Sequence, residues 1–311
     1  FWWHNFRDDG LSQAIGNALA ANPDVWSAAA RLEAAWTQAK IAGADQLPQI
    51  GLTGGLSASK VNMAQFGVTI PNMPSSFLSQ RHNLTLGAQW ELDLWGRVRA
   101  GKRAARANAL GQAADFAGAR HSLAGQVAKG WVMAIEARQQ VRLAKLTLAT
   151  HEITAAQIHA RFELGIISSL DARLAKANFA STKAQVPELE SVASSAIRQL
   201  EVLLGQFPAN KLTVPAELPA MPPAIPVGVP AEILSRRPDL VAAEQRLFAT
   251  GASLTQANAS LYPQFSLTAS GGTSTSELSG LISGDSVVWN VAANLTQPVF
   301  QAGRLRAKVR L

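Results

Sequence analysis

The sequence contains no cysteine among its 311 residues, which excludes a disulfide framework, a thiolate metal site and a cysteine nucleophile. It also lacks any uninterrupted apolar run of about 18 residues, so we expect no transmembrane helix. Charged residues are sparse at 16 %, whereas hydrophobic residues make up 48 %. If the chain crosses a membrane, strands must cross it.

The formal net charge of +7 raises the question of a nucleic-acid surface. The basic residues of one predicted helix are interleaved with alanine rather than aromatic residues: Arg97, Arg99, Lys102, Arg103 and Arg106. We interpret them as a solvated helix face and expect no nucleic-acid partner. The chain opens on Phe1 without the pattern of an export signal, and this leaves the compartment open.

A long-period internal repeat organises the chain. Residues 22–25 (Asn-Pro-Asp-Val) match 237–240 (Arg-Pro-Asp-Leu), and 48–50 (Pro-Gln-Ile) match 263–265 (Pro-Gln-Phe), both at an offset of 215 residues. Residues 96–99 (Gly-Arg-Val-Arg) recur as 303–306 (Gly-Arg-Leu-Arg) at an offset of 207. The shorter offset predicts that the second copy has lost eight residues from a surface loop.

The repeat divides the chain into three regions. We expect repeat one at residues 1–208, a proline-rich connector at 209–230, and an incomplete repeat two at 231–311. Seven of the fifteen prolines lie between Pro208 and Pro230, which is typical of an extended connector. Repeat two contains a helix, two strands and the start of a long helix, and we expect it to lack roughly the last hundred residues of the repeat.

Within repeat one, the pattern predicts a helix at 23–47, strands at 49–60 and 80–95, a long helix at 96–163 and a helix at 168–205. Asn22 and Pro23 have the N-cap and first-turn chemistry of a helix start. Residues 60–79 are interpreted as an exposed loop between the strands. The long segment from Gly96 to Glu163 contains no proline, and as one helix it would measure about 100 Å.

The two strands alternate between apolar and polar residues. In the second strand the apolar set is Leu84, Leu86, Ala88, Trp90 and Leu92, and the polar set includes Thr85, Gln89, Glu91 and Asp93. This alternation is typical of a transmembrane β-strand, but a soluble sandwich strand has the same pattern. The very long helix that follows favours an object that crosses a membrane and extends far beyond it.

Three segments resemble the TolC/OprM family of NodT-like outer-membrane efflux channels, the outer-membrane component of RND-type efflux systems. They are residues 90–99 (Trp-Glu-Leu-Asp-Leu-Trp-Gly-Arg-Val-Arg), 203–208 (Leu-Leu-Gly-Gln-Phe-Pro) and 235–240 (Ser-Arg-Arg-Pro-Asp-Leu). The resemblance covers essentially the whole chain, with its motifs in the expected order.

The resemblance implies a mainly α fold with a small transmembrane β part and two structural repeats. In this TolC-like homotrimer, each protomer gives four strands to a twelve-stranded β-barrel and its helices to a long α-helical barrel. The implied function is a passive exit duct for drugs or other solutes in a tripartite efflux pump. The implied location is the outer membrane, extending into the periplasm, with a periplasmic adaptor, an inner-membrane pump and outer-membrane lipid as partners. The lipid-bearing cysteine of OprM-like members is absent here, so lipidation is left open.

Two sets of candidate site residues follow. Gln89, Glu91 and Asp93 are predicted to face the lumen from the second strand. Leu164, Gly165, Ile166 and Ile167 form the predicted turn between the two helices, where Gly165 suits the left-handed position and Ser168 or Ser169 can cap the next helix. Apolar residues at such a turn, and the likeness of Leu164-Gly165-Ile166 to the Val-Gly-Leu tip of TolC-like channels, imply an adaptor-docking site.

Two alternatives fit parts of the sequence. Long alanine-rich helices would also suit a periplasmic coiled-coil scaffold, although the paired alternating strands argue against it. Residues 57–60 (Ser-Ala-Ser-Lys) match a Ser-x-x-Lys motif but have no partner motif in the chain, and the five histidines are too dispersed to share a metal. We therefore expect no enzymatic activity, no cofactor and no metal.

Overall fold

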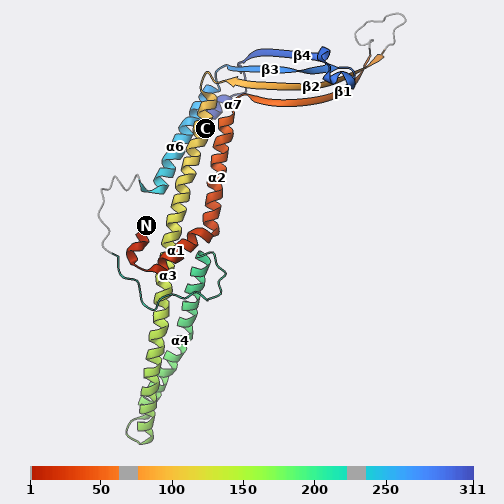
Figure 1. Ribbon diagram of the computed structural model, residues 1–311. Helices are drawn as coiled ribbons and strands as arrows, with labels where there is room; N and C mark the ends of the chain where they lie inside the picture. The colour runs from red at the N-terminus through yellow and green to blue at the C-terminus, as the bar shows by residue number, and fades with distance from the viewer. Residues whose placement is uncertain (1, 63–75, 223–235) are drawn as a thin grey trace, which may run out of the picture. The chain divides into compact units, whose positions relative to one another are not determined.

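The computed structural model describes residues 2–62, 76–222 and 236–311, and it consists of long helices and one small sheet (Figure 1). The elements of repeat one are η1 (Trp2–Phe6), α1 (Asp9–Ala21), α2 (Pro23–Ala44), β1 (Gln49–Asn62), β2 (Ser76–Leu92), α3 (Arg97–Glu163) and α4 (Ser169–Leu203). Those of repeat two are α6 (Pro238–Ala259), β3 (Gln264–Thr275), η3 (Leu278–Ile282), η4 (Gly284–Ser286), β4 (Val287–Thr296) and α7 (Arg304–Arg310).

Two predicted segments fall partly outside the described residues. Most of the predicted loop at 60–79 lies at 63–75, and the end of the connector lies at 223–230. Within the described ranges, none of the helices is both long and apolar enough to span a membrane.

The described residues form two compact units that cut across the repeats. The helical unit contains the chain up to Leu32 together with Gln112–Ala242, and the sheet unit contains Glu33–Gly111 and Ala243–Leu311. Each unit therefore takes residues from both repeats, so the boundary near residue 208 separates sequence copies rather than compact units.

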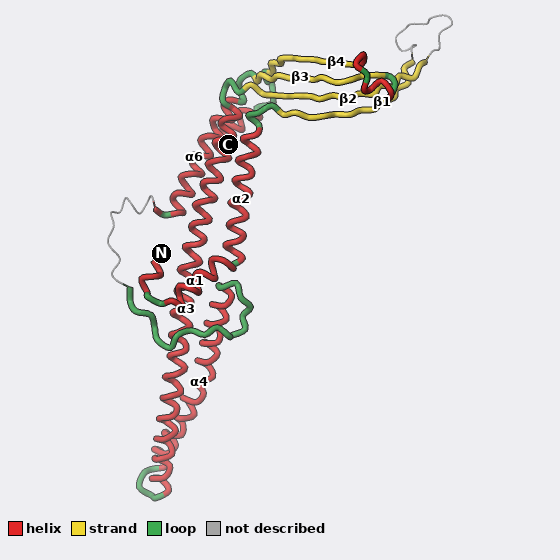
Figure 2. The backbone as a smooth tube through the Cα atoms, in the orientation of Figure 1, coloured by secondary structure: helices red, strands yellow, loops and turns green. Residues whose placement is uncertain are grey.

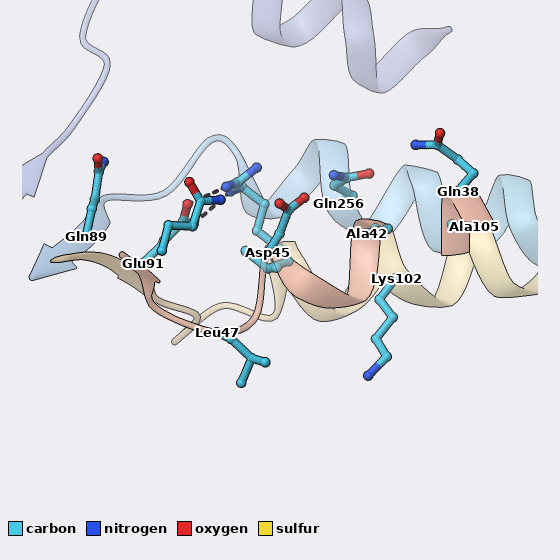
Figure 3. Close-up of a pocket in the computed structure, with 13 residues that line it drawn as sticks. Gln38, Ala42, Asp45, Leu47, Gln89, Glu91, Lys102, Ala105 and Gln256 are labelled. Carbon is cyan, nitrogen blue, oxygen red and sulfur yellow. Dashed lines mark hydrogen bonds and ion pairs between the residues drawn. The ribbon is translucent and has the colours of Figure 1, made fainter. Parts of the chain in front are cut away.

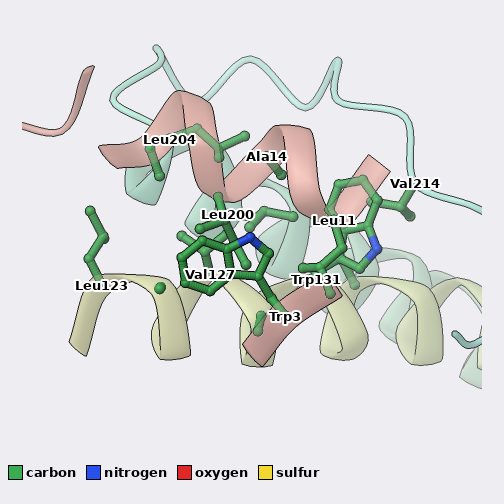
Figure 4. Close-up of a cluster of buried hydrophobic side chains, with 14 of the residues drawn as sticks. Trp3, Leu11, Ala14, Leu123, Val127, Trp131, Leu200, Leu204 and Val214 are labelled. Carbon is green, nitrogen blue, oxygen red and sulfur yellow. The ribbon is translucent and has the colours of Figure 1, made fainter. Parts of the chain in front are cut away.

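The helical unit is held by a core between α1, α3 and α4 (Figure 4). In α1 the buried residues Leu11, Ala14, Ile15 and Ala18 recur at helical spacing, so one face is apolar and packs inward. Leu200 from α4 and Val127 from α3 are fully buried against them. Helix α1 was not predicted from the sequence as a separate helix.

Polar contacts define the two ends of α1. At its start, the Asp8 carboxylate accepts hydrogen bonds from the Leu11 N–H at 2.9 Å and from the Trp131 indole Nε1 at 3.0 Å. At its end, the Asn22 side chain donates to the Leu203 carbonyl at 3.0 Å and accepts from the Asp24 N–H at 2.8 Å. The predicted cap at Asn22 before Pro23 is therefore confirmed.

Helix α4 and the part of α3 from Gln112 onward form an antiparallel hairpin within the helical unit (Figure 2). His151 of α3 hydrogen-bonds to Thr182 of α4 at 2.9 Å, and Lys145 pairs with Glu190 at 2.6 Å. The Thr182 hydroxyl also lies 3.0 Å from the Asn178 carbonyl of its own helix, to which it can donate. The 67 residues of α3 correspond to about 100 Å of helix.

The sheet unit contains a four-stranded antiparallel sheet in the order β1-β2-β3-β4. The two repeats use the same register, because Gln49 pairs with Gln89 in repeat one and the equivalent Gln264 pairs with Thr296 in repeat two. Equivalent side chains also bond to equivalent turns. The Trp90 indole donates to the Gln46 carbonyl at 3.0 Å, and the Gln297 amide donates to the Leu261 carbonyl at 3.1 Å.

Several predicted boundaries differ from the structure. The helix predicted at 23–47 ends at Ala44 because residues 45–48 form a turn, closed by a bond from the Leu47 N–H to the Ala44 carbonyl. The strand predicted at 80–95 runs from Ser76 to Leu92, and its partner extends to Asn62, because the two strands pair along their full length. The helix predicted at 96–163 begins at Arg97, directly after Gly96, and the helix predicted at 168–205 runs from Ser169 to Leu203 and ends shortly before Gly205. Both glycines have positive φ angles, of 76° and 72°.

Candidate functional site

The hairpin turn between α3 and α4 is a Schellman motif followed by a capping box. The Gly165 N–H donates to the Phe162 carbonyl at 2.9 Å and the Ile166 N–H donates to the Arg161 carbonyl at 3.0 Å. Gly165 has a φ of 73°, as predicted for the residue that ends the long helix. Ser168, rather than Ser169, caps α4, because its hydroxyl accepts from the Asp171 N–H while the Asp171 carboxylate accepts from the Ser168 N–H.

The turn carries apolar side chains that are exposed in this chain. Leu164 is 74 % exposed and Ile166 is 66 % exposed, and Leu170 in the first turn of α4 is exposed as well. Ile167 is half-buried, so it contributes less to this surface than its sequence neighbours. A groove of about 730 Å³ lies beside the turn, with Phe162, Ser169 and Phe179 among its lining residues.

Two carboxylates near the end of β2, those of Glu91 and Asp93, form hydrogen bonds with the first turn of α3. The Arg97 guanidinium donates two hydrogen bonds to the Glu91 carboxylate, one of them from Nε at 2.9 Å. The hydrogen bonding to Glu91 raises the pKa of Arg97 above its usual value, although partial burial opposes the shift. This ion pair joins the end of the strand's polar face to the first turn of α3.

Asp93 is an N-terminal cap of α3 and not a strand residue. The strand ends at Leu92, and the Asp93 carboxylate accepts hydrogen bonds from the Val98 N–H at 3.1 Å and the Arg99 N–H at 2.8 Å. Burial raises the pKa of Asp93, but the hydrogen bonds from Arg99 and Val98 outweigh burial and lower it. The prediction that placed Asp93 in the strand beside Glu91 is therefore wrong, because its side chain is used to start the helix.

Gln89 and Glu91 instead line a polar pocket of about 440 Å³ within the sheet unit (Figure 3). Gln38 and Asp45, near the end of α2, line the same pocket, and repeat two contributes Gln256 from α6. In Figure 3, the side chains of Gln89, Glu91, Asp45 and Gln256 project to the same side of the ribbon. Gln256 was not predicted from the sequence, because its place beside Gly101 depends on how α6 packs against the start of α3.

Histidines and carboxylates are the side chains of this chain that could ligate a metal. Within residues 2–62, 76–222 and 236–311, the structure places no group of three His, Asp or Glu side chains where they could hold a metal ion. The carboxylates at the strand end are instead paired with cationic side chains or with backbone N–H groups.

Comparison with protein-family models decides the family. The model described as outer membrane efflux protein matches residues 14–206 and 229–311. The chain belongs to this outer membrane efflux protein family. The match covers both repeats, which confirms the resemblance stated from the sequence motifs, and the mainly α fold with four strands is confirmed as well.

Individual proteins similar to this chain are also named as outer membrane proteins. The toluene efflux pump outer membrane protein TtgF of Pseudomonas putida is 30 % identical over 309 residues, covering 99 % of the chain and 63 % of the relative. The pyoverdine export outer membrane protein OpmQ of Pseudomonas aeruginosa is 32 % identical, covering 99 % and 65 %. The solved structure of the outer-membrane channel OprN is 31 % identical with a TM-score of 0.88, covering 99 % and 68 %. The chain thus spans less than two thirds of these two curated relatives.

Proposed function

We propose that this chain forms part of a passive exit duct of an efflux pump, located in the outer membrane and extending into the periplasm. The observation that carries the proposal is the likeness to an outer-membrane channel over 99 % of the chain at 31 % identity. The named functions of TtgF and OpmQ support an efflux role. The duct conducts drugs or other solutes and catalyses no reaction.

The sheet is the proposed membrane segment. Strand pairing brings the apolar residues of neighbouring strands onto one face, since Leu52 lies opposite Leu86, which lies opposite Gly271, which lies opposite Trp289. Leu52, Leu86 and Trp289 are all exposed in this chain. An apolar face that is exposed among the described residues is suited to lipid, and we propose that it contacts the outer membrane.

The opposite face of the sheet is the proposed lumen surface. It carries Thr53 opposite Thr85 and Gln49 opposite Gln89, with Glu91 near the strand end. We propose that Gln89 and Glu91 face the aqueous lumen through the polar pocket that they line. Asp93 follows the strand, and its carboxylate accepts the hydrogen bonds of the N–H groups at the start of α3.

A labelling experiment tests the membrane assignment. Gln89→Cys is expected to react with a water-soluble thiol reagent, whereas Leu86→Cys, three residues away on the other face, is expected to stay unmodified in the membrane. The chain has no native cysteine, so each signal comes from the introduced thiol alone. Equal labelling of both variants would contradict the proposal, and release of the protein without detergent would favour the periplasmic scaffold instead.

The hairpin turn is the proposed docking site of a periplasmic adaptor that links the duct to an inner-membrane pump. Leu164, Gly165, Ile166 and Ile167 form the turn, and the exposure of Leu164 and Ile166 supports this role because apolar surface without a partner is disfavoured. The Schellman motif holds the backbone of the turn in one conformation, which lowers the entropy cost of ordering the turn when a partner binds.

Substitution of Ile166 tests the docking site. Ile166→Asp is expected to abolish efflux-dependent resistance, because it places a charge in the proposed apolar contact. Ile166→Leu keeps the apolar surface and should retain resistance. The protein level in the outer membrane and its oligomeric state should be unchanged in both variants. If Ile166→Asp retains full resistance at a normal protein level, the turn is not the docking site.

A further inference from the structure

The polar face of the sheet, proposed above as the lumen surface, consists mainly of uncharged residues. Cross-strand partners point to the same side of a sheet, so every second residue of each strand belongs to this face. Serine, threonine, asparagine and glutamine supply most of its polar side chains, as at Ser57, Thr268 and Asn290. Among the strand residues that the structure describes, this face carries two charged side chains, Glu91 and Arg81.

The two charged residues differ in their partners. Glu91 is neutralised by the guanidinium of Arg97, as described for the end of β2. Arg81 is exposed, and it forms no hydrogen bond or ion pair with a residue that the structure describes. Ten residues separate Arg81 from Glu91, which corresponds to about 33 Å of strand. Arg81 is therefore an isolated positive charge on the lumen surface, toward the end of β2 that lies away from α3.

The surroundings of Arg81 offer hydroxyl and amide groups rather than carboxylates. Ser57 lies directly opposite Arg81 on β1, and Ser79 and Asn83 flank it on the same face of β2. The sequence of residues 63–75, between these two strands, contains no aspartate or glutamate. The acidic residues between β3 and β4 are Glu277 and Asp285, and neither pairs with Arg81.

We propose that Arg81 is an anion-contact site of the duct, where carboxylate or sulfonate groups of passing solutes bind transiently, and that it shifts the ion preference of the lumen toward anions. This role of Arg81 rests on the proposed function, since the polar face must line a lumen, and it adds a contact residue and a chemical class of solute.

The guanidinium group is suited to this role. It is always charged, and its planar fork of N–H donors can bind both oxygens of a carboxylate at once. The hydroxyl of Ser57 and the amide of Asn83 can donate to an anion held beside it. Because Arg81 is exposed to solvent, its attraction for an anion is screened and the contact is weak. A weak contact allows the solute to leave, as conduction requires.

Lys60 provides a matched comparison within the same sheet. It is an exposed cation near the same end of the strands, but it lies opposite Leu78, on the apolar face that also carries Leu52 and Leu86. Removing the charge of Lys60 changes the net charge of the protein as much as removing that of Arg81. The two positions therefore separate the effect of a charge on the lumen surface from the effect of net charge.

Reversal potentials across a gradient of potassium acetate test the anion-contact site in the full-length protein, inserted in a planar lipid bilayer. Acetate is the carboxylate probe. Arg81→Gln is expected to lower the permeability ratio of acetate to potassium roughly twofold, the effect of one screened unit charge at about 7 Å in water. Arg81→Glu should lower the ratio further. Arg81→Lys keeps the charge and should retain most of the ratio, and Lys60→Gln should leave it at the wild-type value.

The outcomes separate the anion-contact site from the duct. If Arg81→Gln and Arg81→Glu conduct like the wild type with an unchanged permeability ratio, Arg81 is not a contact site, and the proposed duct still stands. Equal falls in the ratio for Arg81→Gln and Lys60→Gln would also overturn the site, because the effect would then follow net charge. A wild-type protein that inserts into the bilayer and passes no ions would contradict the duct and the contact site together.

Discussion

At the residue scale, the buried carboxylate of Glu201 organises the start of the connector. Glu201 of α4 is only 2 % exposed, and it accepts hydrogen bonds from the N–H groups of Asn210 at 2.7 Å, Lys211 at 2.6 Å and Leu212 at 2.9 Å. Burial raises the pKa of Glu201, but these backbone hydrogen bonds outweigh burial and lower it. A single side chain thus fixes the path of the chain after α4.

The lowered pKa predicts the direction of a pH effect. Because the folded-state pKa of Glu201 lies below the unfolded value of about 4.3, its stabilisation is complete above that pH and is lost as the pH falls through the folded value. Glu201→Gln is expected to lower the free energy of unfolding at pH 7 by roughly 2 to 4 kcal/mol, because a neutral amide cannot accept all three bonds.

Denaturant unfolding in detergent at several pH values measures this effect. The variant should also lose part of the acid sensitivity of the wild-type protein below about pH 4.3. Glu217→Gln is the control, since this glutamate is exposed and should leave stability unchanged. A Glu201→Gln variant as stable as the wild type at pH 7 would show that the carboxylate is not needed to hold the connector.

At the element scale, two helices end on glycines with the same backbone geometry but different surroundings. Gly165 ends α3 with a φ of 73° and Gly205 ends α4 with a φ of 72°. A Cβ atom at Gly165 would meet no atom within 4 Å, whereas one at Gly205 would lie 2.6 Å from the Ala21 carbonyl oxygen. The two positions separate the cost of the left-handed conformation from the cost of a steric overlap.

Alanine substitution at the two glycines is therefore expected to have unequal effects. Gly165→Ala should cost about 1 to 2 kcal/mol, the penalty of the left-handed conformation alone. Gly205→Ala should cost roughly 2 to 5 kcal/mol, because the backbone at Ala21 must also shift. Denaturant unfolding of both variants measures the difference. Equal losses would mean that α1 and the end of α4 are less closely packed than the structure describes.

The elements also show what could be predicted from the sequence. The absence of proline between Gly96 and Glu163 and the period-2 strands were local signals, so α3 and the sheet were predicted with small boundary errors. The role of Asp93 was not predicted, because alternation alone cannot distinguish the last strand residue from a helix cap. Gln256 was missed since its place in the pocket depends on packing between elements far apart in the sequence.

At the scale of the whole molecule, the repeat explains why the chain has open edges and open apolar surface. Strands β2 and β3 form the contact between the two repeats inside the chain, and β1 and β4 are the outer strands of the described sheet. The apolar face of the sheet and the apolar hairpin turn are further surfaces without a partner among the described residues. A duct in a membrane, assembled from several copies and attached to an adaptor, would cover each of them.

Intracellular accumulation of fluorescent efflux substrates tests the central claim most directly. A host strain that lacks this protein is compared with the same strain carrying the wild-type gene, with the adaptor and pump present in both. We expect dye accumulation to fall severalfold when the protein is restored, and we expect this fall to disappear when the pump is removed. Equal accumulation in both strains, across a panel of dyes and with the protein present in the outer membrane at a normal level, would contradict the account.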